Sequence, residues 1–260
     1  MLRGLWSSAC GMAAHKMTID VIANNLANVN TVGFKRSRSD FQDLMYQTLR
    51  QAGARTPTGD QIPAGIQIGM GTMATGVHKM FQQGDFQETK NELDVAVEGK
   101  GFFRVLSNDE ECYTRAGNFK LDSEGNIVTP NGDRLQPDMS VPPDTVSVNI
   151  DKYGNVTAFN FSGQGAVLGV IELYTFPNAA GLYSMGRNLF RETEASGDPT
   201  SSTPGTNGMG TLAQGFLEMS NVDVVEEMVH MIIAQRAYEI SSKAIQTADN
   251  MMQIANNIKR

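Results

Sequence analysis

The chain has 260 residues, a formal net charge of −7, 40% hydrophobic residues and 19% charged residues. This apolar content is sufficient for a packed core, whereas a disordered chain would be more charged and less apolar. The acidic balance argues against a nucleic-acid partner, for which a basic surface is expected. No apolar run reaches the length of about 18 residues that a membrane-spanning helix needs, so we expect no membrane insertion.

Residues 2–26 predict an amphipathic helix, because apolar residues recur at every third or fourth position. The resulting seam is Leu2, Leu5, Ala9, Met12, Lys16, Ile19, Ala23 and Leu26. Its spacing is that of a heptad repeat, and the alkyl stem of Lys16 can lie along it. The apolar stretch before Cys10 is shorter than the roughly 7–15 residues of a signal-peptide core, so we expect no cleaved signal peptide.

The middle of the chain changes to short β-branched and aromatic runs with glycine-containing turns between them. Strands are predicted over 95–105, 113–121, 126–129, 146–150, 155–159 and 167–176. Turns are predicted at 122–126, 130–133 and 151–155. This pattern is typical of a mostly antiparallel β domain, which we place at residues 80–190. The flanking loop-rich stretches form an extended connector region, 36–79 plus 191–219.

Residues 222–258 predict a second long helix, roughly 55 Å at ~1.5 Å per residue. Its seam is Ile233, Ala237, Ile240, Ala244, Thr247, Met251, Ile254 and Ile258. Ser220 and Asp223 mark its start, with the hydroxyl as the cap. One seam cannot bury itself, so we expect it to pair with the N-terminal helix in a helical module of residues 1–35 plus 220–260. The alternative is that both helices lie on the central domain.

The predicted fold class is therefore α+β, with long N- and C-terminal helices that pair as a coiled coil and a mostly antiparallel β central domain. No motif indicates catalysis, a metal or a cofactor: the three histidines are scattered, and the GxG sequences do not continue into phosphate-binding loops. The acidic groups at 109–111 and 226–227 are interpreted as solvated faces. Cys10 and Cys112 are expected to be free thiols.

Four asparagines, Asn24, Asn25, Asn28 and Asn30, lie where the first helix is expected to end, with Gly33 as its stop. An asparagine side chain carries two donors and an acceptor, so it can bridge the backbones of adjacent helices and fix their register. The alternative is a solvated helix end without a partner.

Three blocks of sequence carry a resemblance to a known family. Residues 20–36, DVIANNLANVNTVGFKR, resemble the N-terminal signature of bacterial flagellar rod and hook proteins. Residues 220–252 are similar to the C-terminal signature of that family, and residues 94–105 with 113–137 are similar to its central β domain. The blocks occur in family order and span most of the chain, from residue 20 to residue 252. The connector at 46–69 places the resemblance closest to the distal rod.

The resemblance implies a structural protein without catalysis. In this family the terminal helices form an inner coiled-coil tube, and subunits leave through the type III export apparatus. Copies polymerise helically into the distal rod of the basal body, between the periplasm and the outer membrane. The implied partners are further copies, proximal rod proteins, the hook protein and the peptidoglycan and outer-membrane ring proteins. The candidate assembly interface is Leu5, Met12, Ile19, Asn24, Asn25, Leu26, Asn28, Ile233, Ala237, Ile240, Ala244, Met251, Ile254 and Ile258.

Three alternatives stay open. A proximal rod or hook subunit of the same family would lack a connector of the type found at 46–69. A secreted peptidoglycan-cleaving enzyme would need a converging pair of carboxylates. A cytoplasmic coiled-coil adaptor would not fractionate with the basal body.

Overall fold

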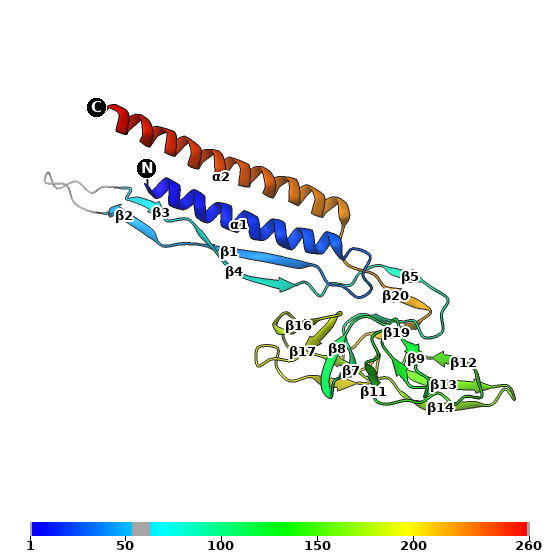
Figure 1. Ribbon diagram of the computed structural model, residues 1–260. Helices are drawn as coiled ribbons and strands as arrows, with labels where there is room; N and C mark the ends of the chain where they lie inside the picture. The colour runs from blue at the N-terminus through cyan, green and yellow to red at the C-terminus, as the bar shows by residue number, and fades with distance from the viewer. Residues whose placement is uncertain (1, 54–62, 259–260) are drawn as a thin grey trace. The chain divides into compact units, whose positions relative to one another are not determined.

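In the computed structural model, residues 2–53 and 63–258 are described (Figure 1). The chain forms two compact units. The helical unit contains residues 1–26, 37–78 and 224–260, and the β unit contains residues 27–36 and 79–223. Both ends of the chain therefore belong to one unit, and most of the β structure belongs to the other.

The helical unit contains two long helices, α1 (Leu2–Ala27) and α2 (Val224–Ile258), which lie side by side (Figure 1). Both predicted helices are confirmed. Their pairing as a coiled coil stays a prediction. The predicted start of α2 is wrong in detail, because the helix begins at Val224 and the Ser220 hydroxyl has no hydrogen-bond partner among the described residues. Asp223 is the residue that directly precedes the first turn.

Two antiparallel strand pairs complete the helical unit. Strand β1 (Ser37–Asp43) pairs with β4 (Thr72–Lys79), and β2 (Tyr46–Arg50) pairs with β3 (Ile66–Gly69). This β2–β3 hairpin lies within the connector region predicted at residues 36–79.

The β unit is built from short strands in several antiparallel sheets. A seven-stranded sheet has the order β16-β17-β8-β7-β11-β10-β9, a three-stranded sheet has the order β12-β13-β14, and three pairs are β15–β18, β19–β6 and β20–β5. A single 3₁₀ turn, η1, spans Ala179–Gly181. The strands are β5 (Phe86–Glu88), β6 (Val95–Glu98), β7 (Phe103–Ser107), β8 (Glu110–Thr114), β9 (Lys120–Leu121), β10 (Ile127–Val128), β11 (Arg134–Gln136), β12 (Thr145–Ile150), β13 (Asn155–Asn160), β14 (Gly165–Val170), β15 (Leu173–Thr175), β16 (Tyr183–Gly186), β17 (Leu189–Arg191), β18 (Thr200–Ser202), β19 (Thr211–Gln214) and β20 (Phe216–Glu218).

The predicted mostly antiparallel β region is confirmed, with two differences. Residues 167–176 were predicted as one strand but form parts of β14 and β15, which pair with β13 and β18 respectively. The change of sheet occurs where the Ile171 N–H leaves the β14 ladder and donates to the Gly154 carbonyl at 2.8 Å. Residues 191–219, which the sequence analysis assigns to the connector, supply β18, β19 and β20 of the β unit.

The three predicted turns share one geometry. In each, the N–H of the residue before the loop and the carbonyl four residues later are hydrogen-bonded at 2.8–3.0 Å. The last loop residue is a glycine with positive φ, at Gly125, Gly132 and Gly154. A three-residue hairpin loop ends in this left-handed conformation, which glycine adopts without steric cost. The glycine-containing motifs were therefore reliable signals for these turns.

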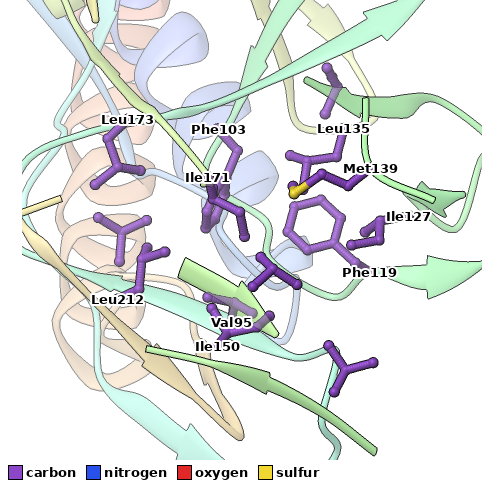
Figure 2. Close-up of a cluster of buried hydrophobic side chains, with 14 of the residues drawn as sticks. Val95, Phe103, Phe119, Ile127, Leu135, Met139, Ile150, Ile171, Leu173 and Leu212 are labelled. Carbon is purple, nitrogen blue, oxygen red and sulfur yellow. The ribbon is translucent and has the colours of Figure 1, made fainter. Parts of the chain in front are cut away.

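The core of the β unit is a cluster of aliphatic and aromatic side chains from both larger sheets (Figure 2). Phe103 and Phe119 meet edge to face, with ring centroids 5.2 Å apart. Val95, Ile150 and Leu212 come from three further strands. Burial of each such side chain contributes about 1.5–3 kcal/mol relative to exposure, so this unit has a core of its own.

We predict that limited proteolysis of the isolated chain trims both helices and leaves the β unit resistant. Long helices depend on packing for most of their stability in water, and α2 carries several exposed isoleucines. Subtilisin digestion followed by mass spectrometry should give a stable fragment that ends near residue 223. Equal resistance of α2 and the β strands would contradict the prediction.

Candidate assembly interface

The face of α2 that is covered within the chain combines small, polar and larger apolar side chains. Ala234 and Ala248 are buried, and Ser241 lies so close to α1 that a β-carbon added to Gly11 would be 3.6 Å from its Oγ. The covered or half-covered residues of this face are Glu227, Met231, Ala234, Ser241, Ile245, Ala248 and Met252. The two helices of one chain therefore contact each other through a face of α2 other than the predicted seam.

The predicted seam of α2 lies one residue away from this face. Ile233, Ile240 and Ile254 are 60%, 67% and 59% exposed. A shift of one residue turns the direction of a side chain by about 100° around a helix with ~3.6 residues per turn. The apolar stripe that the sequence revealed thus faces away from α1 in the single chain.

The remaining members of the predicted interface are distributed over both faces. Met251 and Ala244 are exposed, and Ala237 is half-buried. Among the predicted interface residues of α1, four are half-buried, namely Leu5, Met12, Ile19 and Leu26. The side chain of Ile258 lies outside the described residues. Neither exposure nor burial in one chain tests whether these residues meet another copy, so the interface stays a proposal.

Asn25 is almost fully buried and joins three parts of the helical unit. Its Nδ2 donates to the Ser37 carbonyl at 2.9 Å and to Glu227 Oε2 at 3.2 Å, and its Oδ1 accepts the Ser37 N–H at 2.9 Å. One amide thus fixes the start of β1 against the end of α1 and the first turn of α2. Asn25 therefore bonds to the backbone of a strand and to a side chain of α2. The predicted bridging of two helix backbones by the asparagine cluster stays a prediction.

The other asparagines of the predicted interface behave differently. Asn24 is exposed, and half-buried Asn28 accepts a hydrogen bond from Thr31 Oγ1 at 3.2 Å. The interpretation of residues 226–227 as a solvated face is wrong for Glu227, which is buried against Asn25. Its neighbour Glu226 is exposed and lies 3.3 Å from His230.

Gly33 does not end the first helix, because α1 ends six residues earlier at Ala27. It has φ +70°, and a β-carbon there would lie 2.6 Å from the Ala116 nitrogen. Its N–H donates to the Glu218 carbonyl at 2.8 Å. The glycine is required for this close approach of two backbones within the β unit, and not as a helix stop.

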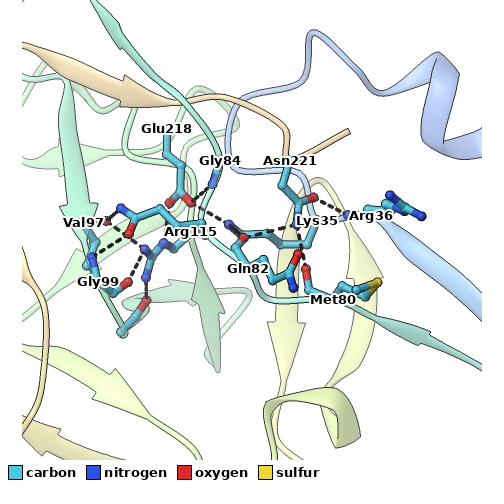
Figure 3. A network of polar contacts seen from close by, with 12 residues as sticks. Lys35, Arg36, Met80, Gln82, Gly84, Val97, Gly99, Arg115, Glu218 and Asn221 are labelled. Atoms are coloured by element: carbon cyan, nitrogen blue, oxygen red, sulfur yellow. Dashed lines mark hydrogen bonds and ion pairs between the residues drawn. The ribbon is translucent and has the colours of Figure 1, made fainter. Parts of the chain in front are cut away.

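Next to Gly33, the β unit buries a cluster of three charged side chains (Figure 3). Glu218 accepts hydrogen bonds from Lys35 Nζ to Oε1 at 2.6 Å and from Arg115 Nε to Oε2 at 2.5 Å. The Gly84 N–H adds a third bond to Oε1 at 3.0 Å. All three charged side chains are at least nine-tenths buried, so none of these charges is screened by bulk water.

Backbone carbonyl oxygens accept the remaining hydrogen bonds that Lys35 and Arg115 donate. Lys35 Nζ donates to the Gln82 carbonyl at 2.7 Å, and the Arg115 guanidinium donates to the carbonyls of Val97, Gly99 and Gly101. This arrangement surrounds two cations and one anion with hydrogen-bond partners. Such pairing is what makes the burial of charge tolerable.

Burial and charge act in opposite directions on the Glu218 carboxyl. Burial by itself would raise its pKa, but the neighbouring Arg115 and Lys35 outweigh burial and hold the pKa below its usual range. The pKa of Lys35 is lowered, chiefly by burial, although Glu218 opposes this change. Glu218 is therefore ionised at neutral pH and holds both cations.

Asn221 extends the network to the chain segment between the two units. Its Oδ1 accepts the Arg36 N–H at 2.7 Å, and its Nδ2 donates to the Met80 carbonyl at 2.9 Å (Figure 3). Together with Glu218 it joins residues 33–36, 80–84 and 218–221. The segment that follows α1 and the segment that precedes α2 are thus held together inside the β unit.

Lys35, Arg115 and Glu218 were not predicted as functional residues. No motif marks them as a group, and the three charged residues are 80 or more positions apart from one another. The only available signal was a single glutamate between apolar residues in FLEM (216–219), which is not specific.

Within the described ranges, no group of three His, Cys, Asp or Glu side chains could hold a metal ion. No helix in the same ranges is long and apolar enough to cross a membrane. Cys10 and Cys112 are free, as predicted. Glu110 and Glu111 start β8 and face Arg191 and Arg104 at 3.3 and 3.1 Å.

Three protein-family models match the chain. "Flagella basal body rod protein" matches residues 7–35, "Flagellar hook protein FlgE/F/G D1 domain" matches residues 96–158, and "Flagellar basal body rod FlgEFG protein C-terminal" matches residues 213–258. These segments contain most of both helices, and each contains one member of the buried charge cluster.

Curated relatives match over nearly the whole length. The chain is 48% identical over 264 residues to the flagellar basal-body rod protein FlgG of Borreliella burgdorferi, covering 100% of both chains. It is 46% identical over 255 residues to FlgG of Buchnera aphidicola subsp. Schizaphis graminum, covering 97% of this chain and 98% of that protein. It is 43% identical over 261 residues to FlgG of Caulobacter vibrioides, covering 99% and 100%.

We predict that Glu218→Gln lowers the free energy of unfolding of the β unit by about 3–5 kcal/mol, because it leaves two buried cations without their anion. The matched control is Glu110→Gln, which removes an exposed ion pair with Arg191 and should cost only ~0–1 kcal/mol. Urea unfolding of the monomer, followed by circular dichroism, measures both. Equal losses would show that the cluster is not a special source of stability.

The difference in unfolding free energy between the parent chain and Glu218→Gln should depend on pH. Since the pKa of Glu218 is lower in the folded chain, its contribution is fully present above the unfolded value of about 4.3 and is lost as the pH falls through the folded pKa. The stability difference between the parent and Glu218→Gln should therefore narrow in acid. A difference that stays constant from neutral pH to strong acid would contradict this assignment.

Proposed function

The chain belongs to the flagellar basal-body rod family and is a structural subunit of the distal rod, and from this premise we propose that its copies polymerise helically through the exposed seam of α2. The observation that carries the proposal is the row of exposed isoleucines beside, and not on, the intrachain face. A row of exposed apolar side chains of this kind is typical of an interaction site.

The size of the apolar contribution agrees with assembly. Burying one isoleucine contributes about 1.5–3 kcal/mol, whereas bringing two chains together costs roughly 4–15 kcal/mol of lost freedom. A few seam residues per contact are therefore needed before association becomes favourable. Ile233, Ile240, Met251 and Ile254 supply that number on a single helix.

The polymer that we propose is a drive shaft between the proximal rod and the hook. Its partners would be proximal rod proteins, the hook protein and the peptidoglycan and outer-membrane ring proteins, with a route through the type III export apparatus. Its place would be the basal body from the periplasm to the outer membrane. A catalytic role is not proposed, because Glu110, Glu111 and Glu227 are each committed to a partner within the chain.

The β2–β3 hairpin is proposed as a second contact between copies. All of its described residues are exposed, including Ile66 and Ile68 on one face of β3. A two-stranded hairpin alone is at best marginally stable in water, so a neighbouring copy would stabilise it. Such an arm would resist bending of the rod.

We predict that Ile240→Asp prevents assembly of the distal rod without damaging the monomer. The side chain is 67% exposed in the single chain, so the charge is harmless until a second copy covers it. An unpaired carboxylate would then be buried at every subunit. Electron microscopy of basal bodies and swimming assays measure the outcome.

Glu239→Gln is the control for Ile240→Asp, because Glu239 points off the seam and pairs with Arg236 at 2.9 Å on the surface. It should assemble normally. Normal rods and swimming in Ile240→Asp cells would exclude the seam as an interface.

We predict that Ile66→Asp combined with Ile68→Asp permits export and polymerisation but gives rods that bend. Gln67→Asp places a charge between these two positions, on the opposite face of the same strand, and serves as the control. Removal of residues 46–69 tests the whole hairpin. The Leu44 N–H donates to the Gly71 carbonyl at 2.9 Å, so the two chain ends that the deletion joins already lie close together. Straight, stiff rods after this removal would count against the arm.

A further inference from the structure

Strand β12 is the outer strand of the three-stranded sheet β12-β13-β14 (Figure 1). Residues 147–150 pair regularly with β13. The side chains of Val148 and Ile150 point into the core of the β unit. No strand is hydrogen-bonded to the outer edge of β12, although β19 lies beside it. The outward-facing backbone groups of β12 therefore need other partners, or they would be available for pairing with another chain.

Two side chains occupy this open edge. Glu92 Oε2 accepts the Val148 N–H at 2.7 Å. Gln214 Oε1 accepts the Ile150 N–H at 3.1 Å, and its Nε2 donates to the Val148 carbonyl at 2.6 Å. The amide of Gln214 therefore bonds to a carbonyl and to the N–H two residues later, as the N–H and C=O of one residue in a neighbouring strand would.

The two side chains are themselves held in place. Gln214 Nε2 also donates to the Glu92 carbonyl at 2.8 Å, and Gln214 is the last residue of β19, paired with Val95. The loop that carries Glu92 is braced by Asp94, which accepts from Thr89 Oγ1 at 2.6 Å and whose carbonyl accepts the Gly215 N–H at 2.7 Å. The edge cap, Glu92 with Gln214, is thus pre-organised.

The sequence of β12 favours pairing with another strand. The strand Thr145–Ile150 has no charged residue and is rich in β-branched side chains, which favours strand pairing. Residues 145–148 of β12 line a groove of about 720 Å³, together with residues 121–125 and 141–143. An exposed edge pairs most simply with the same edge of a second copy, antiparallel about a two-fold axis.

The opposite edge of the sheet is protected by other means. Strand β14 carries an irregularity in its register against β13 between Val156 and Thr157, and it contains Gly165 and Gly169. Bulges and glycines weaken strand addition. The regular stretch of β12 is therefore the edge that requires a cap.

We propose that Glu92 and Gln214 prevent β12 from pairing with β12 of a second copy, so that association is confined to other surfaces of the chain. This inference does not depend on the rod contacts proposed above. If these hydrogen bonds only stabilised the fold, their removal would lower stability without producing a dimer.

The test is the double variant Glu92→Ala/Gln214→Ala in the full-length Ile240→Asp background, which removes association through the α2 seam. The matched control is Glu111→Ala/Gln164→Ala, which deletes the same two residue types from exposed positions of the β unit. Analytical ultracentrifugation should show the mass of two chains for the double variant at concentrations where the control is a single chain. A double variant that stays monomeric overturns the proposal.

A third substitution locates the new contact. Asn149→Lys adds a charge on the exposed face of β12, and a lysine on an edge strand opposes pairing. Added to the double variant, it should restore the single-chain mass. A dimer that persists places the contact elsewhere and overturns the proposal.

Hydrogen exchange of the single variants covers the case in which the double variant does not fold. Glu92→Ala should accelerate exchange of the Val148 amide by at least tenfold, and Gln214→Ala should do so for the Ile150 amide. The Asn149 amide, which faces β13, should stay protected in both. Unchanged protection of Val148 and Ile150 would show that the side chains do not cap the edge.

Discussion

The buried carboxylate of Glu218 is the constraint on which the β unit depends at the point where both helices connect to it. Its two oxygens accept three hydrogen bonds, from Lys35, Arg115 and the Gly84 N–H. Burying a lone charge costs several kcal/mol, and the carboxylate avoids this cost only when every partner is present. The partners come from three separate stretches of chain, so these stretches and the one that carries Glu218 must all be in place before the carboxylate is stable there.

Local signals in the sequence were sufficient for the helices and for the hairpin turns. The turns could be predicted because Gly125, Gly132 and Gly154 each occupy a left-handed position that other residues enter with strain. The strand boundary at Ile171 could not be predicted, because an apolar run of that length does not reveal where a strand changes its partner.

The interface of α2 shows a different limit. Hydrophobic periodicity revealed the row that includes Ile233 and Ile240, and the structure places this row away from α1. The face that contacts α1 includes Ala234, Ser241 and Ala248, whose small side chains give a weaker apolar signal than the isoleucines of the predicted seam. A pattern can show that a face is apolar, but it does not show whether the same chain or another one covers it. The buried charge cluster around Glu218 could not be predicted from local patterns, because its members are far apart in sequence.

The separation of the two faces of α2 has a genetic consequence. A substitution at Ala234 acts on the chain that carries it, because this residue is covered within its own subunit. A substitution at Ile240 leaves its own subunit folded and, in the proposed polymer, acts on the neighbours. Variants of the first class would therefore be recessive to a normal copy of the gene. Variants of the second class would enter a mixed polymer and disturb it, so that they would be dominant.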